Sequence, residues 1–147
     1  LVAWRVSART NTLMVRELSA ESSRETVIVL DTRRVNVPQF EDEFENAVEL
    51  AASLACTLLN RQFSVGFFSN GLFIPLDHGS MHLTKLLDAL ARVQPDMEGA
   101  SDPFHAAVQR DWVPGIRFLF ISPDPEKWAR PVGAGFHVLD PREVIYA

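Results

Sequence analysis

Five short runs of apolar and β-branched residues are spaced along the chain, and each has the length of one strand. The first, Thr26 to Asp31, is apolar between its two ends, which is typical of a central parallel strand buried on both faces. Asn70-Gly71 between the second and third runs predicts a tight hairpin, and Pro75 in the third run fits an edge strand. The runs occupy residues 26–31, 63–69, 72–76, 116–122 and 136–140, with a sixth candidate at 143–146.

Between these runs, apolar residues recur at intervals of three and four positions, which predicts helices. These helical stretches lie at 38–61, 82–93, 103–112 and 126–130. Strands that alternate with helices predict a doubly wound α/β fold: a mostly parallel sheet with one antiparallel edge strand and helices on both faces. In such a sheet the ligand site lies where the strand order reverses, here beside the carboxyl ends of the first and fourth strands, at Asp31 and Ser122.

Composition and charge narrow the class of protein. The 147 residues suffice for one domain, and the longest apolar run is far shorter than the roughly 18 residues of a membrane-spanning helix. A formal net charge of −5, with no basic cluster longer than Arg33-Arg34, argues against a nucleic-acid or anionic-lipid partner. The single cysteine cannot form an internal disulfide, which favours a reducing, cytoplasmic location.

The first residues differ from the rest of the chain. Residues 1–18 predict a β-hairpin, and a strand-like segment starts at once at Leu1 rather than after an initiating Met. We therefore expect residues 1–18 to be the remnant of a preceding domain, and residues 19–147 to form the α/β domain. On this interpretation the chain is a C-terminal fragment of a longer protein.

The stretch AWRVSARTNTLMVREL, at residues 3–18, resembles the signature of the domain of unknown function 58 family. Its matching positions include Trp4, Arg9, Leu13 and Glu17, and the later segments VIVLDT, FENAVELAASLA and HLTKLLDALARV are also similar to that family. The resemblance implies a von Willebrand factor type A-like fold for the α/β domain. It also implies a preceding region with transmembrane helices, which would hold the intact chain at the cytoplasmic face of the inner membrane.

The resemblance raises the question of a metal site. A domains of the adhesive kind bind Mg²⁺ through an Asp-x-Ser-x-Ser loop, a later Thr and an Asp after the fourth strand. Here the loop reads Asp31-Thr32-Arg33-Arg34-Val35, so an arginine and a valine replace the two hydroxyl ligands. Ser80 could stand for the Thr, and Asp124 follows the expected Asp position by one residue. The sequence therefore predicts no metal and no cofactor, with Arg33 paired to Asp31 in place of the ion.

Two histidines four residues apart, His78 and His82, pose a separate question of zinc binding. The Gly79-Ser80 between them places His78 in a loop and His82 at the start of a helix, and no glutamate completes a metalloprotease motif. We expect both histidines to lie in solvent and to bind no metal.

The resemblance implies a non-enzymatic protein-interaction module, a partner of MoxR-type AAA+ ATPases in the assembly or maturation of other proteins in bacteria. The predicted contact face is made of Asp31, Thr32, Arg33, Arg34, Ser80 and Asp124, with the two arginines binding carboxylates of the partner. The alternative is a metal-assisted hydrolase or phosphoryl-transfer enzyme with a strand-end cleft at Asp31 and Asp124. A pocket in which these two carboxylates converge favours the enzyme, whereas a rim filled by Arg33 or Arg34 favours the module.

Overall fold

The computed structural model describes residues 24–69, 71–96, 102–104, 106–107 and 115–123, together with the backbone of 136–139. Residues 103–104 and 106–107 are helical. The longer elements follow one another as β1 (Glu25–Leu30), α2 (Phe40–Asn60), β2 (Ser64–Ser69), β3 (Leu72–Asp77), α3 (Ser80–Arg92), β4 (Arg117–Ile121) and β5 (Phe136–Leu139). Each of these begins and ends within two residues of its predicted position.

Some predicted segments lie outside the described residues. They are the hairpin at 1–18, the helix at 126–130 and the sixth strand at 143–146. The proposed boundary between residues 18 and 19 also lies there, so the division into a remnant and a domain stays a prediction.

The five strands form one sheet in the order β3-β2-β1-β4-β5. β1 is parallel to both β2 and β4, β4 is parallel to β5, and only β3 runs antiparallel, against β2. Gly71, in the turn between β2 and β3, has a φ of 79°, a left-handed conformation that glycine adopts without strain. The predicted α/β fold, with one antiparallel edge strand that carries Pro75, is confirmed.

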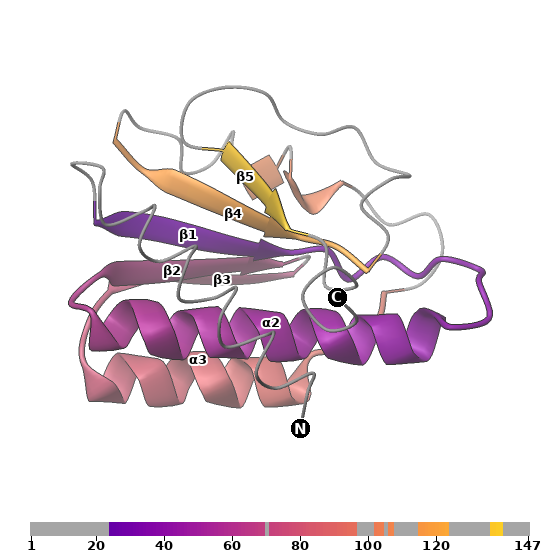
Figure 1. Ribbon diagram of the computed structural model, residues 1–147, viewed down its shortest axis with the longest axis horizontal. Helices are drawn as coiled ribbons and strands as arrows, with labels where there is room; N and C mark the ends of the chain where they lie inside the picture. Colours follow the sequence, from indigo (N-terminus) through magenta and orange to yellow (C-terminus); the bar gives the residue numbers. More distant parts are fainter. Residues whose placement is uncertain are drawn as a thin grey trace, which may run out of the picture.

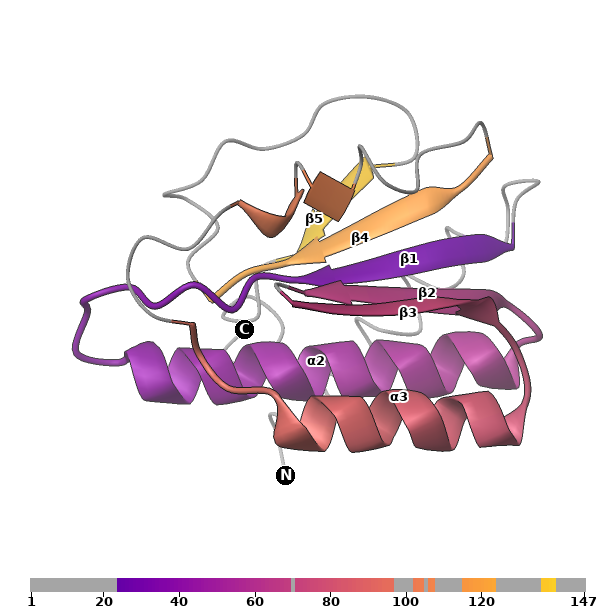
Figure 2. The ribbon, with the colours of Figure 1, turned by 180° about the vertical axis from the view of Figure 1, so that it is seen from behind.

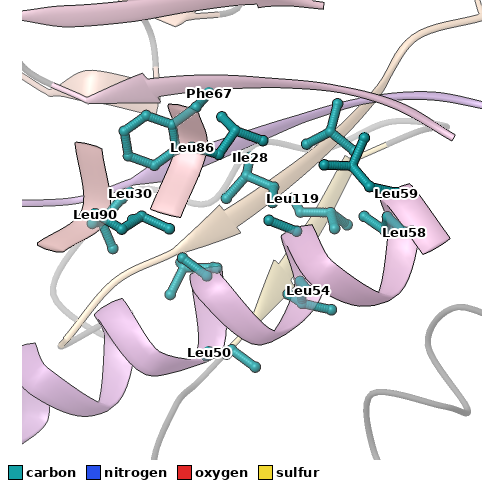
Figure 3. Packing of buried hydrophobic residues seen from close by; sticks show 14 of the residues in the cluster. Ile28, Leu30, Leu50, Leu54, Leu58, Leu59, Phe67, Leu86, Leu90 and Leu119 are labelled. Atoms are coloured by element: carbon teal, nitrogen blue, oxygen red, sulfur yellow. The ribbon is translucent and has the colours of Figure 1, made fainter. Parts of the chain in front are cut away.

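Alternate residues of the central strands fill two separate cores. Ile28 and Leu30 face α2 and α3, and they pack with Leu54, Leu86 and Leu119 in the larger core (Figure 3). The two long helices lie side by side on this face of the sheet in both views (Figures 1 and 2). Strand residues that point to the other face form the smaller core: Val27, Val29, Phe118 and Phe120. Phe104 and Ala107, from the helical residues 103–104 and 106–107, cover it.

The direction of the strands gives the sheet two distinct ends. β1, β2 and β4 all finish at one end, which we call the carboxyl end, and α2 starts there (Figure 1). β3 runs the opposite way and returns the chain to the amino end, where α3 begins (Figure 2). Because β1 has β2 on one side and β4 on the other, the strand order reverses beside Asp31 as predicted.

Within the described ranges, no helix is both long enough and apolar enough to cross a membrane.

Candidate functional site

Asp31 follows the last residue of β1 and is fully buried at the carboxyl end of the sheet. Its backbone N–H donates to the carbonyl of Ile121 at 2.8 Å, which extends the pairing of β1 with β4 by one more bond. The Asp31 side chain has 0% exposure. A carboxylate without solvent needs a hydrogen-bond donor for each of its lone pairs, or a cation beside it.

Four donors surround the Asp31 carboxylate. Arg33 contributes three of them: its Nε donates to Oδ1 at 2.9 Å, its Nη2 to Oδ2 at 3.1 Å, and its backbone N–H to Oδ1 at 3.1 Å. The hydroxyl of Ser122, at the end of β4, donates to Oδ2 at 2.9 Å. Two carboxylate oxygens accept about four hydrogen bonds in total. The Asp31 carboxylate is therefore saturated, and the Asp31–Arg33 pair predicted from the sequence is confirmed.

The Arg33 guanidinium is itself buried, with 7% of the residue exposed. Besides its two bonds to Asp31, its Nη2 lies 3.7 Å from the carboxylate of Asp102. The bidentate contact with Asp31 is the strongest geometry available to an arginine and a carboxylate. Our expectation that Arg33 binds a carboxylate of a partner is corrected, because its buried guanidinium already lies against the carboxylates of Asp31 and Asp102.

Arg34 differs from its neighbour, since 43% of its side chain is exposed. Its Nη1 donates to Glu41 in the first turn of α2 at 2.8 Å, and its guanidinium lies 5.2 Å from the centre of the Phe40 ring. Of the two arginines, Arg34 is the one that a partner could reach.

Thr32 joins the carboxyl end of β1 to the segment that follows α3. Its side-chain hydroxyl donates to the carboxylate of Asp96, and the Asp96 N–H donates to the Thr32 carbonyl at 2.6 Å. Arg33 and Asp96 form an isolated parallel bridge at the same place. Asp96 and Asp102 thus belong to the site, although no motif in the sequence pointed to them.

Two of the predicted site residues do not join this cluster. Ser80 is exposed at the start of α3, at the amino end of the sheet, so its predicted place beside Asp31 is wrong. The reason is that β3 is antiparallel and carries the chain away from the carboxyl end before α3 begins. Asp124 lies outside the described residues, and its predicted convergence with Asp31 stays a prediction.

The donor set at Asp31 does not suit a divalent metal ion. Mg²⁺ requires about six oxygen ligands, and a cation already occupies the position against both oxygens of this carboxylate. Among the residues that the structure describes, no group of three or more His, Cys, Asp or Glu side chains is arranged to hold a metal.

The chain matches the family described as a protein of unknown function, DUF58, over residues 1–144. The chain belongs to the DUF58 family. Neither a curated protein nor a solved structure matches it.

An open groove adjoins the buried cluster of this DUF58 chain. The groove has a volume of about 510 Å³ and runs between the β2–β3 hairpin and the second half of α3. Leu72 and Phe73 line its hairpin side, Lys85 and Arg92 line its helix side, and Asp96 connects it to Thr32. The carboxyl end of the sheet therefore combines a closed network of charged groups with an accessible, mixed apolar and charged surface.

The expectation that His82 lies in solvent is wrong. This histidine is buried, and its Nε2 lies 2.6 Å from the carbonyl oxygen of Val65, at the start of β2. This contact anchors the first turn of α3 to the sheet, whereas His78 is exposed as expected. The sequence offered one signal for this role, since His82 stands four residues before Leu86 on the apolar face of the helix.

Proposed function

We propose that this DUF58 chain is a non-enzymatic protein-interaction module that contacts its partner through the carboxyl end of the sheet. The proposed partner is a MoxR-type AAA+ ATPase that acts in the assembly or maturation of other proteins. This choice of partner rests on what the family resemblance implies. The location of the contact rests on the groove and on the exposed charges around it.

The observation that carries the proposal is the saturation of Asp31. A general base or a metal ligand needs a lone pair that is open to its substrate or ion. Both oxygens of Asp31 are instead engaged by Arg33 and Ser122, in a position without solvent. This arrangement weighs against metal-assisted hydrolysis or phosphoryl transfer at Asp31, and it favours a rigid scaffold for the surface around it.

The accessible part of the contact face differs from the predicted set. Asp31, Thr32 and Arg33 are buried, so they support the contact face from inside the molecule and do not contact the partner themselves. Arg34 and Glu41 present exposed charges on one side of it. On the other side, the groove is lined by the exposed Leu72 and by Lys85, which is also exposed. A partner segment that pairs an apolar side chain with a carboxylate would complement this side of the face.

A capture experiment with charge-reversed variants tests the proposal. The immobilised chain should retain the purified AAA+ ATPase encoded beside it, and Arg34→Glu or Lys85→Glu should lower retention about tenfold, because each opposes a carboxylate of the partner. Arg61→Glu is the matched control, since Arg61 is an exposed arginine just after α2, at the amino end of the sheet.

Three results would contradict the proposal. If the parent chain does not retain the ATPase, the partner is wrong. If both test variants bind as the parent does, or if Arg61→Glu loses as much binding as they do, the contact face is wrong.

A further inference from the structure

A buried guanidinium joins three separate parts of the chain at the carboxyl end of the sheet. Arg33 binds Asp31 at the end of β1, and Asp31 in turn accepts a bond from Ser122 at the end of β4. The same guanidinium faces Asp102, just before the helical residues that cover the second core. Arg33 is thus the positive centre of a small cluster of carboxylates and hydroxyls drawn from distant parts of the sequence.

We propose that Arg33 is the resident cation of this site, and that it holds these segments together in the way that a bound divalent metal ion would. The residues around Arg33 are oxygen donors, and hard cations bind such donors. The position between the Asp31 and Asp102 carboxylates is filled by a cation that is part of the chain. This proposal concerns the chain alone and does not depend on the proposed partner.

The chemistry of the guanidinium explains why arginine can act in this way. Its planar fork places two N–H groups against the two oxygens of one carboxylate and leaves further N–H groups for other acceptors. Its charge does not depend on pH over any ordinary range. Because it is covalently attached, chelators cannot remove it, and the free concentration of divalent ions does not affect its occupancy. The parent chain should therefore be equally stable with and without divalent ions.

Removal of Arg33 should open the position to a metal. In Arg33→Ser, the Asp31 carboxylate keeps Ser122 and gains a nearby hydroxyl, while Asp102 loses its cation. Asp31, with the Ser122 hydroxyl beside it, and Asp102, whose Oδ1 also accepts from the Phe104 N–H at 2.9 Å, would then have no cation between them. These oxygen donors form a set that Mg²⁺ can bind, with water completing its shell. We expect the variant to be less stable than the parent in a chelator and to recover in Mg²⁺.

Thermal unfolding measures both effects. In EDTA, the midpoint of Arg33→Ser should fall by about 10 °C, and 10 mM Mg²⁺ should restore about half of that loss. The parent and Arg34→Ser should each shift by less than about 1 °C on addition of Mg²⁺, since their Asp31 remains saturated. Arg33→Ser/Asp31→Asn should show no recovery, because the main carboxylate ligand is gone.

Two outcomes overturn the proposal: a Mg²⁺ response of the parent as large as that of Arg33→Ser, or a destabilised Arg33→Ser that does not respond to Mg²⁺. If Arg33→Ser is unfolded in EDTA, circular dichroism during a Mg²⁺ titration gives the answer. Refolding supports the proposal, and a chain that stays unfolded contradicts it. Arg33→Lys provides a further check, because it keeps the charge and should retain more stability in EDTA than Arg33→Ser.

Discussion

The carboxyl end of the sheet buries an ion pair, and the amino end keeps its ion pair in solvent. At the amino end, Arg24, Glu25, Arg61 and Asp77 are all exposed, and the Asp77–His78 pair lies in solvent. At the carboxyl end, Asp31 and Arg33 are buried and contact each other. Thr32, between them in the sequence, is also buried and donates a hydrogen bond to Asp96. Burying an ion pair brings a desolvation cost that a sheet can avoid, as the amino end shows. The carboxyl end of the sheet therefore contains a buried ion pair, whereas the charged residues named at the amino end stay in solvent.

The largest effect in this comparison should come from Asp31→Asn. The substitution keeps the shape of the side chain but leaves the buried Arg33 without its main counter-charge, and we expect a loss of about 3–5 kcal/mol in the free energy of unfolding. Urea denaturation followed by circular dichroism measures this loss. Asp77→Asn, on the exposed end, should change stability by less than about 0.5 kcal/mol. Equal losses in the two variants would remove the distinction between the ends.

An intermediate effect should come from Thr32→Val. Valine has nearly the same shape but cannot donate to Asp96, whose carboxylate is partly buried, so we expect a loss of about 1–3 kcal/mol. Urea denaturation again provides the measurement. Thr84→Val is the matched control, because the Thr84 hydroxyl donates to the Ser80 carbonyl on an exposed part of α3. A smaller loss for Thr32→Val than for this control would show that the hydrogen bond from Thr32 to Asp96 contributes little to stability.

The smallest effect should come from Arg34→Ala, next to Arg33 in the sequence. Its ion pair with Glu41 is exposed, so its removal should cost about 0.5 kcal/mol in low salt and almost nothing in 1 M salt. Chemical denaturation at the two salt concentrations tests this. A loss that exceeds about 2 kcal/mol, or one that salt does not weaken, would contradict the contrast between the buried and the exposed arginine.

Most of the fold could be predicted from the sequence because its signals are local. The apolar run of β1, the three- and four-residue spacing of α2 and the turn around Gly71 each report the structure of their own segment. The parallel order then follows from the alternation of strands and helices. The pairing of Arg33 with Asp31 could be predicted as well, since the two residues are separated by one position.

The parts of the site that the sequence did not predict depend on contacts between distant segments. Asp96 lies 64 positions from the Thr32 that it contacts, and nothing in its neighbours marks that role. The prediction for Ser80 was wrong for a related reason. Its hydroxyl group suggested a place beside Asp31, but the antiparallel strand β3 carries the chain to the other end of the sheet before Ser80. Side-chain chemistry alone does not reveal which end of a sheet a loop reaches.

A double-mutant cycle between Asp31 and Arg33 tests the central claim most directly. The free energy of unfolding would be measured for the parent, Asp31→Asn, Arg33→Met and the double variant. Each single substitution leaves one buried charge without its main counter-charge, whereas the double variant removes both charges. The double variant should therefore lose about 2–3 kcal/mol less stability than the sum of the two single losses. Losses that add to within about 0.5 kcal/mol would mean that the two residues act independently, and would contradict the account of Arg33 as the cation that holds the carboxyl end of the sheet together.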